Sequence, residues 1–129
     1  MDSEKKLTVL IADDSSQTLE VIAYNLRVAG YEVTTAADGK EAIAILKAKT
    51  VFDIVISDIH MPNVDGFGLA KFVSTLKPKP YFFLMTADND INEWDAIDKG
   101  ADGLFKKPFD GSRLTVKLAV LQRTKGKKA

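Results

Sequence analysis

The sequence predicts an α/β fold in which five parallel strands alternate with five helices. Two kinds of segment alternate along the chain: short, nearly continuous apolar runs, and stretches whose apolar residues recur every three or four positions. Continuous apolar runs are typical of strands that are covered on both faces. Because βα repeats connect by right-handed crossovers, this order favours one parallel sheet with helices on both faces.

The predicted strands are rich in β-branched and aromatic residues, as strands usually are. They cover residues 9–12 (VLIA), 31–36 (YEVTTA), 54–57 (IVIS), 81–86 (YFFLMT) and 103–105 (GLF). Prolines at positions 78 and 80 and glycines at positions 30 and 100 separate strands from helices.

The predicted helices show apolar residues at helical spacing. The series are Leu19, Ile22, Ala23 and Leu26; Ala42, Ile45 and Leu46; Leu69, Phe72, Val73 and Leu76; Ile91, Trp94 and Ile97; and Leu114, Leu118 and Leu121. Ser15 or Ser16 is expected to cap the first helix and Gly30 to end it. Asp38 and Glu41 have the spacing of a capping box for the second helix.

The composition is that of one ordinary globular domain and excludes several kinds of site. The chain has 129 residues, of which 46% are hydrophobic and 28% charged, and it contains no cysteine. Disulfides and cysteine-ligated metals are therefore excluded. No apolar run approaches the ~18 residues that span a bilayer, and the polar start MDSEKK does not resemble a signal peptide. We therefore expect a cytoplasmic protein that does not bind membranes.

The charge balance gives no indication of nucleic-acid binding. Lys and Arg number 18, as do Asp and Glu, and a neutral domain lacks the basic surface that DNA-binding domains present. We therefore expect no direct DNA binding. The basic C-terminal tail with Lys125, Lys127 and Lys128 is interpreted as a solvated chain end, with a linker stub or a weak anionic contact as the alternatives.

Charged and hydroxyl side chains gather where the predicted strands end. Asp13 and Asp14 follow the first strand, Asp58 follows the third, Thr86 ends the fourth, and Lys106 and Lys107 follow the fifth. In a parallel α/β sheet this edge is where ligands bind. Three crowded carboxylates favour a hard divalent cation such as Mg²⁺, and a nearby Lys and Thr can bind phosphate oxygens. The set predicts a phosphoryl-transfer site with an aspartate as acceptor.

Four motifs in this order resemble the receiver domain of two-component response regulators. They are ADD at residues 12–14, SDIHMPNVDG at 57–66, MTA at 85–87 and KKPF at 106–109. The resemblance covers residues 8 to about 122 and implies a single flavodoxin-like, doubly wound domain with strand order 2-1-3-4-5. Residues 123–129 would be the tail.

The resemblance also implies a role for each acidic residue. Asp58 would accept a phosphoryl group from a histidine kinase or a histidine phosphotransfer protein. Asp14 would bind Mg²⁺ directly, Asp13 mainly through water, and the backbone carbonyl of His60 would be a further ligand beside Asp58. The His60 side chain itself is expected to face solvent.

On the other side of the site, the resemblance implies that Thr86 is the switch hydroxyl and Lys107 the phosphate-binding lysine. Lys106 should point elsewhere because side chains alternate along a strand. The Lys107–Pro108 bond would be cis. Leu104 stands where most relatives carry the switch aromatic, so we expect the response to run through residues 86–92 and the following helix.

These features predict a signalling switch that changes its affinity for an unidentified downstream partner and catalyses only its own phosphorylation and dephosphorylation. An aspartyl-phosphate hydrolase would need an acid at position 60, and a flavin or nucleotide binder would need a phosphate loop where ADDSSQ stands. A receiver-like domain that is never phosphorylated is disfavoured by the intact acceptor, acids, Thr and Lys. Trp94 is expected either to pack over the sheet edge or to dock a partner.

Overall fold

The strands form one parallel sheet, as the sequence predicts, in the order β2-β1-β3-β4-β5 that the family resemblance implies. A computed structural model of the chain describes residues 6–48, 51–107 and 118. The strands are β1 (Thr8–Ala12), β2 (Glu32–Ala36), β3 (Ile54–Asp58), β4 (Tyr81–Thr86) and β5 (Gly103–Lys106). Each boundary lies within one residue of its predicted position.

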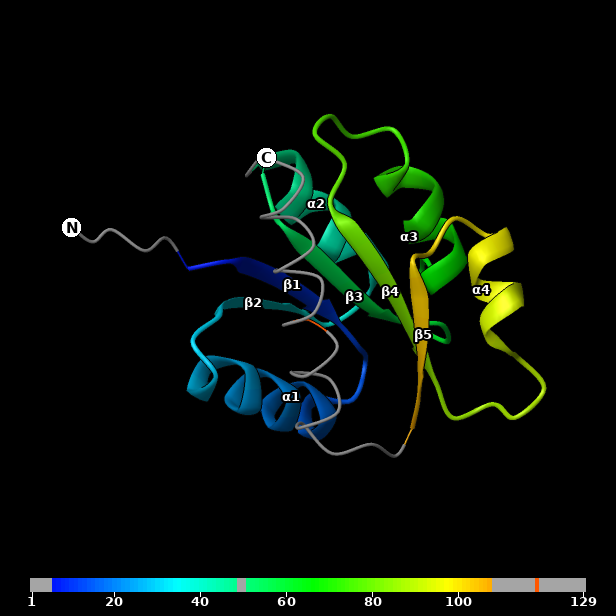
Figure 1. Cartoon of the computed structure of the whole chain (residues 1–129), viewed down its shortest axis with the longest axis horizontal. Helices are drawn as coiled ribbons and strands as arrows, with labels where there is room; N and C mark the ends of the chain where they lie inside the picture. Colours follow the sequence, from blue (N-terminus) through cyan, green and yellow to red (C-terminus); the bar gives the residue numbers. More distant parts are fainter. Residues whose placement is uncertain (1–5, 49–50, 108–117, 119–129) are drawn as a thin grey trace.

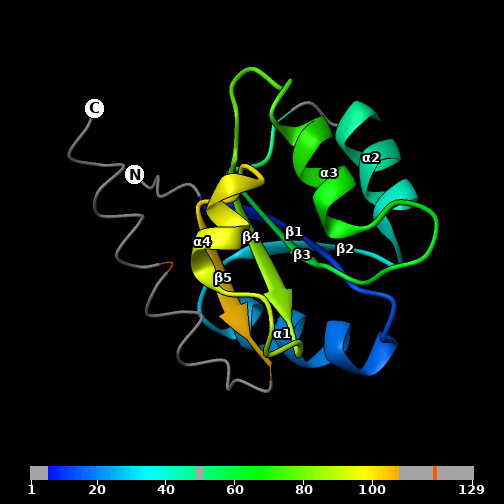
Figure 2. The ribbon, with the colours of Figure 1, turned by 90° about the vertical axis from the view of Figure 1, so that its right-hand side faces the viewer.

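Helices cover both faces of the sheet (Figures 1 and 2). Helix α1 (Ser16–Val28) lies on one face, and α2 (Gly39–Ala48), α3 (Gly66–Val73) and α4 (Glu93–Asp98) lie on the other. The predicted fifth helix falls outside the described residues except for Leu118, which is helical and fully buried among residues of the α1 face. No helix in the described part of the chain is long and apolar enough to cross a membrane.

Two apolar layers fill the space between the sheet and its helices. The alternation of side chains along β1 divides the strand between them, because Val9 and Ile11 face α1 whereas Leu10 and Ala12 face α2 and α3. All four predicted core residues of α1 are buried. The sheet is thus covered on both faces, and its carboxyl-terminal edge is left for the chemistry.

The helix ends follow the predicted capping pattern. The Ser15 hydroxyl accepts a hydrogen bond from the backbone amide of Thr18 at 3.3 Å, and Gly30 adopts a φ of 102° just beyond α1. The Asp38 carboxylate accepts from the Glu41 amide at 2.8 Å. The Glu41 side chain reaches back to the Ala37 amide at 2.6 Å, one residue before the cap position of an ordinary capping box.

Helix α4 does not bury the apolar series that the sequence indicated. Its buried residue is Ala96, whereas Trp94 is 75% exposed and Ile97 is 43% exposed. The reason is local, since an Asn92–Asp95 capping box fixes the helix start and directs Ala96 toward the core. Of the two alternatives for Trp94, packing over the sheet edge is therefore wrong, and docking of a partner stays a prediction.

Candidate functional site

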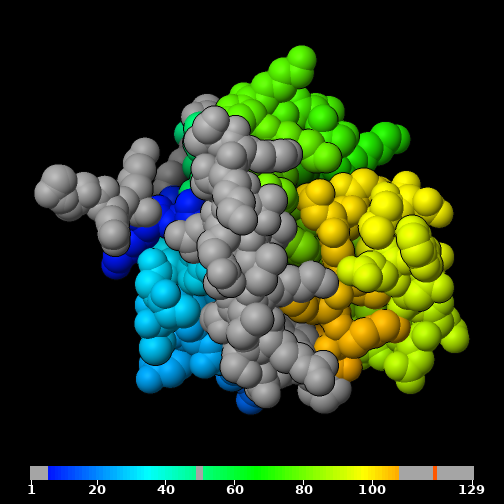
Figure 3. Space-filling model, viewed as in Figure 1, coloured from blue at the N-terminus to red at the C-terminus, as the bar shows by residue number. Residues whose placement is uncertain are grey.

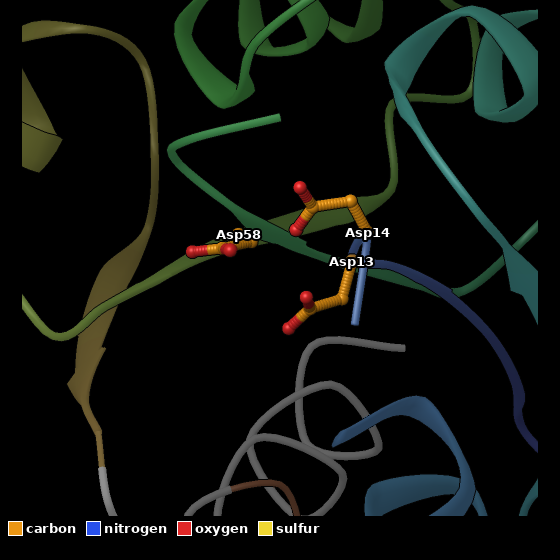
Figure 4. A group of neighbouring side chains, drawn as sticks. All are labelled: Asp13, Asp14 and Asp58. Atoms are coloured by element: carbon orange, nitrogen blue, oxygen red, sulfur yellow. The ribbon is translucent and has the colours of Figure 1, made fainter. Parts of the chain in front are cut away.

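Three aspartates meet at the carboxyl-terminal edge of the sheet, where the sequence predicts them. Asp13 and Asp14 follow β1 and Asp58 ends β3; these strands are neighbours, with Ala12 paired with Ser57. Each of the three carboxylates offers an oxygen within 4.8 Å of the others (Figure 4). Asp13 is 1% exposed and Asp58 8% exposed, whereas Asp14 is open to solvent.

Lys107 lies against two of these carboxylates. Its ammonium donates a hydrogen bond to Asp13 Oδ2 at 2.7 Å and lies 3.5 Å from Asp58 Oδ2. The other oxygen of Asp13 accepts from the backbone amide of Ser15 at 2.9 Å. Each oxygen of the buried Asp13 therefore has a partner, while Asp58 has the longer contact with the ammonium and a hydrogen bond with the Ile59 backbone.

The pKa values of Asp58 and Lys107 reflect this arrangement. Burial raises the pKa of the Asp58 carboxyl above its ordinary value; Lys107 opposes the rise and the charge of Asp13 adds to it. Burial alone would lower the pKa of Lys107, but the hydrogen bond with Asp13 and the charges of Asp13 and Asp58 together raise it. The site thus places a carboxyl whose charged form is disfavoured by burial beside a lysine whose charged form is favoured by its two carboxylate neighbours.

The backbone around Asp58 is held closely by the loop that follows β3. The Ser57 hydroxyl donates to the Asp58 carbonyl at 2.8 Å, and the Gly66 amide donates to the Ile59 carbonyl at 2.8 Å. A Cβ atom at Gly66 would stand 2.5 Å from the Asp58 carbonyl oxygen and 2.8 Å from Ile59 Cα. Only glycine allows this approach, so residue 66 fixes the position of the loop over Asp58.

Thr86 ends the neighbouring strand and is completely buried. Strands β3 and β4 pair Asp58 with Met85, which places Thr86 one residue beyond this pair. The Thr86 hydroxyl accepts a hydrogen bond from the backbone amide of Asp88 at 3.0 Å. Its own proton remains available for a second partner.

Asp88 is a component of the site that the sequence analysis missed. Besides the bond of its amide to Thr86, its carboxylate lies 3.8 Å from His60 Nε2. The His60 side chain is 68% exposed, which confirms that it faces solvent. The available signal was the Thr-x-Asp spacing, since a threonine hydroxyl often bonds the amide two residues on.

The residues of β5 divide as the strand alternation predicts. Lys106 points away from the aspartates and donates to the backbone carbonyls of Asp88, at 3.0 Å, and Ile91. Leu104 is half-buried and packs against the core layer under α2, α3 and α4. The predicted cis bond between Lys107 and Pro108 involves a residue outside the described part of the chain.

The aspartate cluster has the donor chemistry that Mg²⁺ requires. Carboxylate oxygens are hard ligands, and an open site with one or two carboxylates and room for water suits this ion. Asp14 is exposed to solvent and Lys107 stands further from Asp58 than from Asp13, whereas Lys107 and Ser15 bond the two oxygens of Asp13 at 2.7 and 2.9 Å. This agrees with a direct role for Asp14 and an indirect one for Asp13. A ligand role for the His60 carbonyl stays a prediction.

Known proteins are similar to this chain in sequence. The model of the response regulator receiver domain matches residues 9–119. The chain is 34% identical over 96% of its length to a probable transcriptional regulator, ycf27, of Guillardia theta, covering 49% of that protein. It is 31% identical over 90% of its length to the alkaline phosphatase synthesis transcriptional regulatory protein PhoP of Bacillus subtilis, again covering 49% of it.

Solved structures show the same architecture. The chemotaxis response regulator CheY4 of Vibrio cholerae matches with a TM-score of 0.76 at 35% identity, covering 92% of this chain and 98% of that one. A response regulator receiver domain from Clostridium thermocellum matches with a TM-score of 0.85 at 26% identity, covering 95% and 99%. The chain spans about half the length of the curated relatives it matches. With a family model matching most of its length, the chain belongs to the receiver domains of two-component response regulators.

Proposed function

We propose that this receiver domain is a phosphorylation-dependent switch in which Asp58 takes up a phosphoryl group and a surface beyond β4 changes its affinity for a partner. The observation that carries the proposal is the position of Asp58. It is a buried carboxylate with a raised pKa, 3.5 Å from a lysine ammonium and within 4.8 Å of two further carboxylates. Burial with mixed charge around one carboxylate is characteristic of a reactive group.

The phosphoryl donor would be the phosphohistidine of a histidine kinase or a histidine phosphotransfer protein. An Asp58 carboxylate oxygen attacks the phosphorus, the O–P bond forms as the P–N bond breaks, and the leaving imidazole nitrogen keeps the electron pair. Asp14 and Asp58 would hold Mg²⁺ directly and Asp13 mainly through water, and the ion would supply positive charge that stabilises the phosphoryl oxygens.

Lys107 and Thr86 have distinct parts in this proposal. The Lys107 ammonium already lies 3.5 Å from Asp58 Oδ2, so a short movement brings it to a phosphoryl oxygen while Asp13 still anchors it. The Thr86 hydroxyl donates to no group among the described residues, so it can donate its proton to a second phosphoryl oxygen. Its acceptor side stays bound to Asp88, so Thr86 would transmit the change to the loop of residues 87–92.

The output is a change of affinity and not the turnover of a separate substrate. Trp94 and Ile97, exposed on α4 beyond that loop, are apolar groups that a protein partner can cover. The neutral charge of the chain favours a protein over DNA as the direct partner of this domain. The curated relatives are named transcriptional regulators and are about twice as long, so a DNA-binding role of a whole protein is a separate question.

The proposal is tested by incubating the protein with acetyl phosphate and Mg²⁺ and measuring its intact mass. We expect a gain of one phosphoryl group that requires Mg²⁺ and is absent from Asp58→Asn. Asp90→Asn, which removes an exposed acid outside the cluster, is the matched control and should retain the gain. Borohydride reduction, which converts an acyl phosphate on aspartate to homoserine, locates the group by peptide mapping. A mass gain that survives in Asp58→Asn would place the acceptor elsewhere.

A further inference from the structure

Two adjacent lysines at the end of β5 have opposite environments. Lys107 lies among the aspartates, whereas the exposed side chain of Lys106 extends to the loop between β4 and α4. There its ammonium donates to the backbone carbonyls of Asp88, at 3.0 Å, and of Ile91. Residues 87–92 are here called the β4–α4 loop. One side chain of β5 thus bonds two backbone carbonyls of this loop.

The register of the sheet places this lysine beside the proposed switch residue. Strand β4 pairs with β5 so that Thr86 lies opposite Lys106, and the Lys107 amide donates to the Thr86 carbonyl at 2.7 Å. Figure 3 shows the segment of residues 88–100 (yellow) at the surface, directly beside β5 (orange). Lys106 therefore lies next to any movement of Thr86 or of the β4–α4 loop.

Asp88 connects Thr86 and Lys106. Its backbone amide donates to the Thr86 hydroxyl at 3.0 Å, and its backbone carbonyl accepts from the Lys106 ammonium at 3.0 Å. The two groups belong to one residue, so a displacement of Thr86 that carries the Asp88 amide with it strains the bonds to Lys106. Because that ammonium is exposed to solvent, water competes for it and the attachment is reversible.

We propose that Lys106 is a positioning residue that holds the β4–α4 loop of the unphosphorylated protein in place and so opposes the movement of Thr86 toward a phosphoryl group on Asp58. The claim that Lys106 opposes the movement of Thr86 rests on the proposed function, whereas the claim that Lys106 holds the loop does not. In a two-state switch, a contact made only in the resting state lowers the apparent affinity for whatever favours the other state.

The hold is tested in the unphosphorylated, metal-free protein by amide hydrogen exchange followed by NMR. Lys106→Met keeps the aliphatic stem and removes the ammonium, and it should speed exchange at the Asp88 and Asp90 amides about fivefold. Ile56 in β3 serves as an internal reference and should not change. Lys71→Met, which removes a charge from α3, is the matched control, and Lys106→Arg, which keeps a donor, should restore slow exchange. Unchanged loop exchange in Lys106→Met overturns the proposal.

The claim that Lys106 opposes the movement of Thr86 is tested by titrating the same variants with beryllium fluoride and Mg²⁺, which together mimic the phosphoryl group. Lys106→Met should bind the mimic about threefold more tightly than the wild type, with Lys71→Met unchanged. Equal or weaker binding by Lys106→Met would show that the lysine does not restrain the switch. A wild-type protein that fails to bind the mimic would defeat the proposed function and the opposition together, whereas the exchange experiment would still decide whether Lys106 holds the loop.

Discussion

On the β1–β3 side of the site, Asp13 and Asp58 are buried, and the Asp58 backbone is enclosed by a loop that approaches it at Gly66. On the β4–β5 side, the β4–α4 loop is attached by Lys106, an exposed side chain, and α4 buries Ala96 alone among its described residues. The first side is held by packing and buried hydrogen bonds. The second is held by one bond to the buried Thr86 hydroxyl and by Lys106, which water can reach.

This difference assigns a separate task to each side. A reactive carboxylate and its metal ligands need fixed geometry, which close packing provides. A switch needs a segment that can move at small cost, and such segments have few buried apolar contacts and exposed hydrogen bonds. The β4–α4 loop and α4 fit that description, so we expect the response to phosphorylation there.

The largest expected effect lies on the rigid side. Gly66→Ala brings a methyl group against backbone atoms of Asp58 and Ile59 that cannot yield, and we expect it to lower the free energy of unfolding by about 3 kcal/mol. Gly68→Ala is the matched control in the same helix, because its new methyl meets the Val64 side chain, which can shift. Urea unfolding should place this control within about 1 kcal/mol of the wild type. Equal losses in both variants would contradict a rigid Asp58 loop.

Lys107→Met should have the next largest effect. It leaves the buried Asp13 and Asp58 carboxylates without their cation, and we expect a loss of about 2 kcal/mol in the metal-free protein. Because the pKa of Lys107 is raised on folding, its stabilisation is present at neutral pH and is lost only as the pH rises through the raised pKa. Lys106→Met, one residue away, should cost less than about 0.5 kcal/mol. Similar losses for the two lysines would remove the distinction between the sides.

Asp14→Asn tests the metal-binding part of the rigid side. Asp14 is the exposed member of the cluster, and its replacement should weaken Mg²⁺ binding at least about tenfold, or ~1.4 kcal/mol. The same change relieves carboxylate repulsion, so the metal-free fold should become slightly more stable. Asp90→Asn controls for the loss of one negative charge. A calorimetric Mg²⁺ titration that is the same for Asp14→Asn and wild type would show that Asp14 is not a ligand.

Asp58→Asn should have the smallest effect on folding, because Lys107 partly offsets the cost of the buried charge. The raised pKa of Asp58 means that the folded protein binds this proton more tightly than the unfolded chain does. The variant should therefore be more stable than the wild type above the raised pKa, and the gain should vanish as the pH falls below about 3.8. Urea unfolding across this range checks the sign. A gain that persists in acid would indicate a cause other than the charge.

The sequence predicts the rigid side well, because the features that define it are local. The strand ends carry Asp13, Asp58 and Lys107, and a parallel sheet brings its strand ends together. The series of four apolar residues at helical spacing in α1 is long enough to define the buried face of this helix. Strand alternation correctly separates Lys106 from Lys107.

The sequence predicts the β4–β5 side, with the β4–α4 loop and α4, less well. Helix α4 has only six residues, so its cap at Asn92, and not its apolar series, decides that Ala96 is buried and Trp94 is exposed. The role of Asp88 depends on its backbone groups; the Thr-x-Asp spacing signals the bond to Thr86, but not the one to Lys106. Both misses concern segments held by few contacts, where small local features outweigh periodicity.

Backbone NMR of the wild-type protein with beryllium fluoride and Mg²⁺ tests most directly whether an event at Asp58 moves the β4–α4 side. We expect shifts around Asp14, Asp58 and Lys107 that continue through the β4–α4 loop into α4. The fluorescence of Trp94, the single tryptophan, should change in parallel, and Thr86→Ala should blunt both responses beyond β4 while the mimic still binds. Shifts confined to the surroundings of Asp14, Asp58 and Lys107, with unchanged Trp94 fluorescence, would contradict the account.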